Sequence, residues 1–258
     1  MTSSGNVVLA GPNRRIDILA LLEQLADLSI DVTFLDGALN RLAAMTSADG
    51  LILSTGAAFD SRIPVIARHA QAMESLFHYP KYAADAGLEQ RGKVSWSDGK
   101  EAARSLPFGS VLDEHMLATL TDWMRVAGEG VCIVPGIFNP GLFQKGVAAL
   151  EQFLAGKQFV FASPLNLLTT GQPEVWQESF SALKKKGAGV AYLHPVHLNF
   201  MTVNPFFPRY LQKTASYVAD FVDKMQLLQA VKESVRESVV VDILQPPHPD
   251  LLDLCHLN

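Results

Sequence analysis

The feature that most constrains this fold is the alternation of short apolar runs with helical patterns. Apolar, β-branched runs occupy residues 6–10, 31–35 and 50–53, and a turn containing Gly, Pro, Asn or Ser follows each of them. Residues 16–28 carry apolar side chains at helical spacing. Strands and helices that alternate at this spacing are typical of βαβ units, in which the strands run parallel.

The alternation continues through the rest of the chain. It predicts an α/β fold with a mainly parallel open sheet and helices on both faces, a Rossmann-like three-layer arrangement, interrupted by an irregular excursion around residues 79–110. The further predicted strands are residues 93–96, 130–134, 159–162, 189–193, 197–203 and 238–243, and the further predicted helices are residues 63–77, 115–127, 140–155, 173–186 and 211–231.

The length of 258 residues allows one large domain. We expect a single α/β domain over residues 1–258, with two lobes as the alternative, residues 1–78 and 107–258, joined by residues 79–106. A composition of 48% hydrophobic and 18% charged residues suits a sheet that is covered on both faces.

Charge and composition exclude several classes of partner. The net charge is −5, and the run of lysines at residues 184–186 ends a predicted helix before Gly187, where it complements the helix dipole. We therefore expect no nucleic-acid partner. The first residues lack the features of a signal peptide and no run of about 18 apolar residues occurs. We expect no membrane partner, a cytoplasmic location and, with two distant cysteines, no disulfide framework.

Polar turns recur where the predicted strands end, at residues 11–15, 36–41, 54–57 and 202–205. Ligands of open parallel sheets bind at the carboxyl ends of the strands, so these turns predict a shared crevice. The candidate ligand-binding residues are Asn13, Arg14, Asn40, Arg41, Ser54, Thr55, Gly56 and Asn204, and the candidate catalytic residue is Asp36.

Each candidate has a chemical role and a structural alternative. Backbone N–H groups of Gly56 and Ala57, with the start of the next helix, would hold an anion. Arg41 or Arg14 would pair with a phosphate or carboxylate, and Asp36 would orient a hydroxyl, an amine or a metal. The alternative is that such turns need Gly, Asn and Ser only for their geometry. Likewise, the two phenylalanines after Asn204 form either an apolar wall or a rigid capping loop.

Familiar catalytic motifs are absent or incomplete. Residues 87–95 look like a phosphate-binding P-loop, but Val94 stands where Ser or Thr must follow the lysine. No G-x-G-x-x-G follows a strand and no G-x-S-x-G elbow occurs. His194 and His197 would point to opposite faces of a strand, so we expect no metal site.

The turns together resemble a known family. The segments Asn6–Asn13, Leu35–Arg41 and Ile52–Ala57, with Thr202–Pro208 and Val239–Asp242, resemble a reactivase subunit of the adenosylcobalamin-dependent lysine 5,6-aminomutase or ornithine aminomutase. The resemblance implies an accessory protein that works with an ATPase partner subunit to exchange damaged cobalamin on the mutase. It implies a nucleotide or cobalamin as ligand. Fuller members carry a P-loop upstream of the Gly11–Asn13 turn, and we expect none in this chain, so we expect no nucleotide hydrolysis by this chain alone. A shortened homologue, a partner-dependent subunit and a relative with another function remain the alternatives.

Three functions therefore remain open from the sequence. The first is the accessory protein of a cobalamin enzyme, with a nucleotide-like or small anionic ligand. The second is a stand-alone enzyme acting on a small anionic metabolite, with Asp36 as acid or base and Arg41 with the Gly56 turn as the anion clamp. The third is an assembly subunit whose turns are structural. We also expect a homo-oligomer, and the sequence leaves open whether the chain is an enzyme.

Overall fold

The computed structural model describes residues 11–12, 14–28, 30, 32–35, 45–83, 92–98, 103–126, 128–242 and 244. The chain divides into two compact units, residues 1–49 and residues 50–258. The predicted lobes at residues 1–78 and 107–258 stay a prediction.

In the first unit, helix α1 spans Arg15–Asp27, which confirms the predicted helix. The predicted strand at residues 31–35 is wrong for residues 32–35, which are described and carry no strand. A strand needs a hydrogen-bonded neighbour as well as an apolar run, and Phe34 in this segment is exposed. The predicted strand at residues 6–10 lies outside the described residues.

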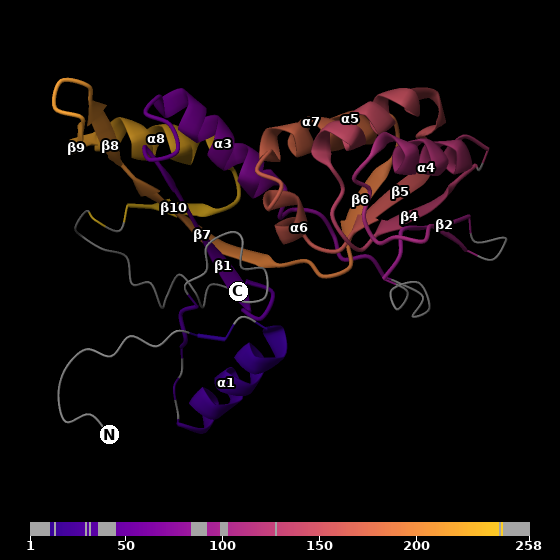
Figure 1. The fold of residues 1–258 in the computed structure, drawn as a ribbon, viewed down its shortest axis with the longest axis horizontal. Helices are drawn as coiled ribbons and strands as arrows, with labels where there is room; N and C mark the ends of the chain where they lie inside the picture. Colours follow the sequence, from indigo (N-terminus) through magenta and orange to yellow (C-terminus); the bar gives the residue numbers. More distant parts are fainter. Residues whose placement is uncertain are drawn as a thin grey trace. The chain divides into compact units, whose positions relative to one another are not determined.

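The second unit contains a parallel three-stranded sheet, here called sheet A. Its strand order is β1 (Gly50–Gly56), β7 (His197–Asn204) and β10 (Val239–Val241), and both strand pairs are parallel. Helices α3 (Ile63–Ser75) and α8 (Lys224–Ser234) lie side by side over one face of it (Figure 1). The fold thus uses β-branched and leucine-rich runs as buried parallel strands, as the sequence predicts.

A second, mixed sheet, here called sheet B, has the order β3-β2-β4-β5-β6. Strands β4, β5 and β6 are parallel, whereas β2 pairs antiparallel with β4 and β3 antiparallel with β2. Helices α4, α5 and α7 lie side by side over one face (Figure 1). The bounds are β2 Ser95–Ser97, β3 Arg104–Ser105, α4 Glu114–Val126, β4 Gly130–Val134, α5 Pro140–Ala149, η2 Glu151–Phe153, β5 Lys157–Phe161, α6 Pro164–Leu168, α7 Pro173–Lys185 and β6 Gly189–Tyr192.

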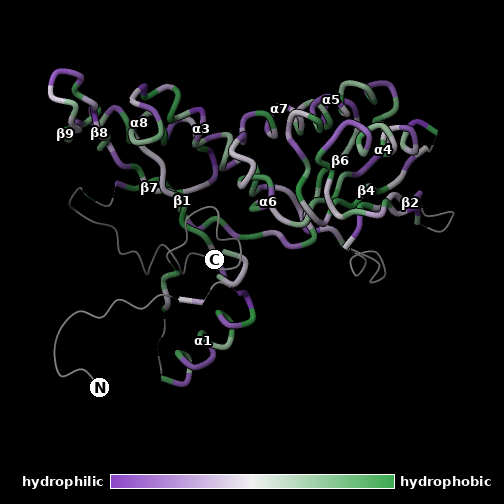
Figure 2. Tube along the Cα trace, viewed as in Figure 1, coloured by the Kyte–Doolittle hydropathy of each residue, from purple (hydrophilic) through white to green (hydrophobic). Residues whose placement is uncertain are grey.

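The core between sheet B and its helices is aromatic. Phe143 of α5 lies within ring-contact distance of five other aromatic rings, and its centroid is 5.0 Å from that of Trp176. Figure 2 shows the strands of this sheet as mostly hydrophobic. Cys132 is fully buried, as predicted, and burial raises the pKa of its thiol to about 12. Its role is therefore packing rather than reactivity.

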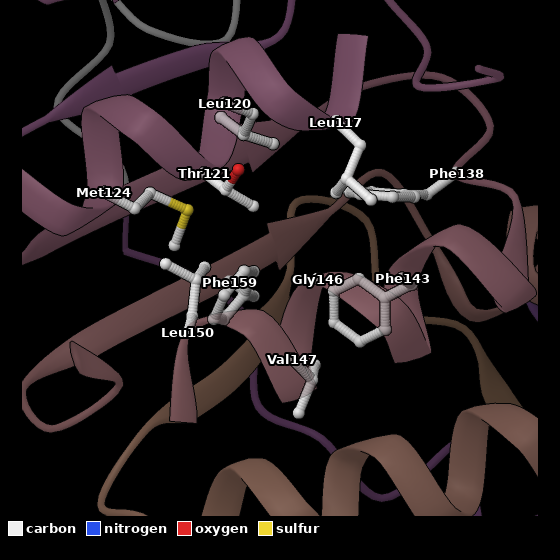
Figure 3. Close-up of a pocket in the computed structure, with 10 residues that line it drawn as sticks. All are labelled: Leu117, Leu120, Thr121, Met124, Phe138, Phe143, Gly146, Val147, Leu150 and Phe159. Atoms are coloured by element: carbon white, nitrogen blue, oxygen red, sulfur yellow. The ribbon is translucent and has the colours of Figure 1, made fainter. Parts of the chain in front are cut away.

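A small apolar gap separates α4 from α5 (Figure 3). Its volume is about 10 Å³, and Thr121 contributes the only side-chain hydroxyl among its lining residues. A space of that size holds one water molecule at most, and its walls offer too few polar partners for that water. The gap is a packing defect of the core and not a ligand site.

Helix α3 connects the two sheets. It packs against α8 over sheet A and against α7 over sheet B. Between α3 and α7, His69 Nδ1 lies 2.7 Å from Glu174 Oε1, and the Phe59 ring stacks on His69 at 4.0 Å. From sheet B, the hydroxyl of Tyr192 donates a hydrogen bond of 2.7 Å to the Leu76 carbonyl just after α3. These contacts hold sheets A and B together within the second unit.

The predicted helix at residues 211–231 is wrong in its first half. Residues 206–221 form a hairpin of β8 (Phe206–Leu211) and β9 (Ser216–Phe221), and the helix starts only at Lys224. The side chain of Asp223 caps that helix by accepting from the backbone N–H of Gln226. The aromatic residues Tyr217 and Phe221 and the β-branched residue Val218 of β9 favour a strand. The loop predicted around Phe206 and Phe207 is therefore the start of β8.

The parallel α/β prediction is confirmed by both sheets, with the antiparallel strands of sheet B as a departure from it. Helix α7 ends at Lys185, and Gly187 has a φ of +76°, which confirms the predicted helix end. Within the part of the chain that the structure describes, none of the helices has the length and apolar character needed to cross a bilayer.

Candidate functional site at the carboxyl edge of sheet A

Strands β1 and β7 end side by side. Their register pairs Ser54 with Thr202, Thr55 with Val203 and Gly56 with Asn204. Because the strands are parallel, both carboxyl ends lie at the same edge of the sheet. The structure thus brings together the candidates near position 56 and the candidate at position 204, which are about 150 residues apart in the sequence.

The three residues at positions 54–56 belong to β1 itself, not to a turn after it, and Thr202 to Asn204 likewise belong to β7. The predicted turns at residues 54–57 and 202–205 therefore begin later than the sequence indicates. Three residue pairs in these segments continue the ladder, because each strand supplies the partner of the other.

A hydroxyl pair lies at this edge. Ser54 Oγ and Thr202 Oγ1 are 2.7 Å apart, so one of them donates to the other. Ser54 is exposed and Thr202 is buried. Each hydroxyl keeps acceptor capacity beyond this one bond, because a hydroxyl offers one donor and two lone pairs. The pair can therefore present both a donor and an acceptor to a polar ligand.

The third strand adds a carboxylate. Val241 of β10 pairs with Thr202, so Asp242 follows at the same carboxyl edge. Asp242 is buried, and its Oδ1 accepts a hydrogen bond of 2.9 Å from the backbone N–H of Leu244. Sequence reasoning did not select Thr202 or Asp242 as site residues. The available signal was a polar residue at the last position of an apolar strand run.

The expected anion site at Gly56 and Ala57 is taken by the protein's own groups. The Ala57 N–H donates to the Asn204 carbonyl at 2.9 Å. Helix α3 does not follow directly, because it starts at Ile63. Just before that start, hydrogen bonds from the Arg62 side chain and backbone lower the pKa of Asp60 to about 2. The Asp60 carboxylate is therefore bound to the backbone and side chain of Arg62 just before the helix begins.

Asn204 combines a structural role with exposure. Its side-chain oxygen accepts a hydrogen bond of 3.0 Å from the backbone N–H of Phe206, which forms a local Asx-type turn. Its carbonyl accepts from Ala57. The residue is exposed to solvent. Asn204 thus fixes the loop between β7 and β8 at the carboxyl edge.

The structure does not relate the other candidate residues to this edge. Arg14 lies in the first unit, where its guanidinium makes hydrogen bonds of 2.7 and 3.0 Å to the carboxylate of Asp17, which raises the pKa of Arg14. The Arg14 guanidinium, predicted to pair with a phosphate or carboxylate, is therefore already bound to Asp17. The remaining candidates, Asn13, Asp36, Asn40 and Arg41, lie outside the described residues.

Two other groups of polar residues lie away from the carboxyl edge. Lys157 starts β5 and is buried; burial lowers its pKa, and its Nζ donates to the Gly128 carbonyl and lies 5.7 Å from the centroid of the Trp96 ring. His194 follows β6 whereas His197 starts β7, and both are exposed. Among the described residues, no group of three or more His, Cys, Asp or Glu side chains is arranged to hold a metal ion.

Comparisons of this chain with protein-family models, with curated proteins and with solved structures give no significant match. Fold and site together define the class of protein. It is a parallel α/β protein with a hydroxyl pair and a carboxylate at the carboxyl edge of a three-stranded sheet.

A Gly56→Ala substitution is expected to lower the free energy of unfolding by about 1–3 kcal/mol, the cost of overpacking. A Cβ at this position would lie 2.1 Å from the Asn204 carbonyl oxygen, a backbone atom that cannot rotate away. Denaturant unfolding measures the change. Gly128→Ala is the control, because nothing lies within 4 Å of a Cβ there. Equal stability of the two variants would contradict the close approach of β1 and β7.

Proposed function

We propose that this chain is an accessory, ligand-binding protein of a cobalamin-dependent aminomutase, with a nucleotide-like or other anionic ligand at the carboxyl edge of sheet A. The observation that supports this proposal is the in-register pairing of β1 with β7, which puts Ser54, Thr202 and Asn204 side by side. Polar groups at the ends of parallel strands are the usual ligand-binding position of such sheets.

The chemistry of the edge favours a ligand with hydroxyl groups, or a phosphate that arrives with a bound cation. Hydroxyls of Ser54 and Thr202 offer donors and acceptors, and a buried carboxylate at Asp242 would pair with ligand hydroxyls or a ligand-bound cation. Nucleotides and the nucleotide tail of cobalamin carry both kinds of group. The proposal keeps the Rossmann-like three-layer arrangement expected from the strand and helix pattern, and it keeps the expected homo-oligomer. The ATPase or mutase partner follows from the sequence resemblance.

The stand-alone enzyme is the competing proposal. It depends on Asp36 and Arg41, which lie outside the described residues. Its ligand would be a small acid, so the same experiment separates the two.

The test is a thermal-shift titration of the full chain with ATP, with adenosylcobalamin and with small amino and carboxylic acids. A ligand at a concentration of 100 times its dissociation constant stabilises the folded protein by about 2.7 kcal/mol, which raises the thermal midpoint by several degrees. We expect a shift with ATP or adenosylcobalamin. We also expect Ser54→Ala to weaken that binding by about two- to tenfold, the worth of one hydrogen bond.

The matched control is Ser181→Ala, which removes another exposed hydroxyl, on α7 over sheet B. It should bind like the unmodified chain. A shift with small acids alone would favour the enzyme. Absence of any shift, or equal binding by Ser54→Ala and Ser181→Ala, would contradict a ligand at this edge.

A further inference from the structure

The hairpin after β7 has one face made entirely of exposed residues, here called the aromatic face. The register of β8 and β9 places three cross-strand pairs on it. All six residues are exposed. They are Phe206 with Phe221, Pro208 with Ala219, and Tyr210 with Tyr217.

The ring pairs on this face are preformed. Phe206 and Phe221 have centroids 5.7 Å apart, and Tyr210 and Tyr217 have centroids 5.1 Å apart. The exposed fractions are 36% for Phe206, 51% for Tyr210, 70% for Tyr217 and 62% for Phe221. Rows of large apolar side chains left in water mark interaction sites rather than ordinary surface.

The opposite face of the hairpin differs in chemistry. There Arg209 forms an ion pair of 2.7 Å with Asp220, and Phe207, Leu211 and Val218 are half-buried. The hairpin therefore packs on the rest of its unit through the opposite face and not through the aromatic face. An isolated two-stranded ribbon is marginally stable, so a partner on the free face would also stabilise the hairpin.

We propose that the aromatic face is a homodimer interface, which packs against the same face of a second copy of this chain. This inference does not depend on the proposed ligand. A twofold interface brings each patch onto itself, so a charge near the twofold axis would meet its own copy, a like charge. None of the six residues is charged, which suits self-association and gives a charged partner nothing to recognise.

The available area fits a small dimer. An aromatic side chain buries about 150–250 Å², so the exposed parts of the four rings offer about 300–550 Å² per copy. Two copies would bury about 600–1,100 Å² from these rings alone, close to the roughly 1,000 Å² of a specific interface. Pro208 has no backbone N–H to donate, which impairs the addition of a further strand along the edge of β8. Association through the side chains of the aromatic face is therefore the favoured mode.

The test is the oligomeric state of the full chain by sedimentation velocity over a concentration series. We expect a concentration-dependent dimer. Tyr217→Asp puts a carboxylate on the aromatic face of both copies and should raise the dimer dissociation constant at least tenfold. The control is Ser216→Asp, which puts the same charge on the neighbouring residue of the opposite face and should leave the dimer intact.

Circular dichroism and the thermal midpoint of each variant show whether it folds, and Phe221→Ser serves as a second, uncharged disruption. A monomeric unmodified chain at about 100 μM, well above a micromolar dissociation constant, would overturn the proposal. So would a dimer equally strong in Tyr217→Asp and Ser216→Asp. A chain ending at residue 244 that dimerises where the full chain does not would assign the face to the chain's own C-terminal segment instead.

Discussion

Replacing Phe143 by Ala should lower the free energy of unfolding by about 3–5 kcal/mol, the usual cost of deleting a buried aromatic ring. Phe143 is 1% exposed and lies against Phe138, Phe159, Phe161, Trp176 and Phe180. The loss has two causes, since the ring no longer leaves water on folding and its neighbours cannot close the cavity.

This core is poorly placed to relax. The small gap beside Phe143 in Figure 3 already shows that α4 and α5 do not close completely. The rings that surround Phe143 come from β5, α7 and the segment before α5. A movement that filled the new cavity would have to shift several elements at once, which a close-packed interior resists.

Thermal and denaturant unfolding measure this effect, with Phe153→Ala as the matched control. Phe153 is also a phenylalanine next to α5, but its side chain is 43% exposed. We expect a change within about 1 kcal/mol for the control, as for most surface positions. Similar losses in the two variants would mean that the aromatic cluster is not the main core of sheet B.

Replacing Glu74 by Ala should cost about 3 kcal/mol or more. Glu74 lies on α3, is 3% exposed, and its Oε1 accepts hydrogen bonds from the backbone N–H groups of Glu237 at 2.8 Å and Ser238 at 3.1 Å. Bonds to a charged acceptor contribute about 1.5–3 kcal/mol each. His78 adds a contact of 3.2 Å to the same carboxylate.

The Glu74→Ala variant should lose stability locally at β10 as well as in the whole fold. The two N–H groups lie immediately before β10, so Glu74 fixes the start of the strand that precedes Asp242. Hydrogen exchange should therefore quicken most at the amides of Val239–Val241, because local opening becomes easier when such anchors are removed. This result would connect the α3 contact to the carboxyl edge of sheet A.

Two further variants separate hydrogen bonding from charge. Glu74→Gln keeps a carbonyl oxygen as acceptor and should lose less stability than Glu74→Ala. Glu178→Ala removes an exposed carboxylate on α7 and should leave stability nearly unchanged. If Glu74→Ala unfolds at the same denaturant concentration as Glu178→Ala, the buried carboxylate is not an anchor for β10.

Local pattern predicted most of the regular elements. Strand β4 has the predicted bounds, and α3, α4 and α7 lie within one or two residues of theirs. These segments carry clear apolar patterns, and a Gly or Pro follows β4, α4 and α7 within two residues. The pattern failed at residues 211–221, because apolar spacing there fits a helix and the strand is decided by pairing with β8.

The candidate site divides in the same way. Sequence alone indicated that Ser54, Thr55, Gly56 and Asn204 stand where apolar strand runs end, which is a local property. It could not indicate that the hydroxyls of Ser54 and Thr202 would lie 2.7 Å apart, since that depends on strand register. It also could not show that the Ala57 N–H, expected to bind an anion, donates to the Asn204 carbonyl, or that the Arg62 N–H donates to Asp60.

The amino-acid order by itself determined the class of fold, the positions of the buried strands and the polar character of the strand ends. These follow from hydrophobic periodicity and turn chemistry, which act between residues close in the chain. Only the tertiary structure decided that β1, β7 and β10 are neighbours and that the aromatic face of the hairpin stays in water. The first depends on pairing between distant segments, which local sequence patterns do not encode. The second depends on which face of the hairpin packs against the rest of the unit.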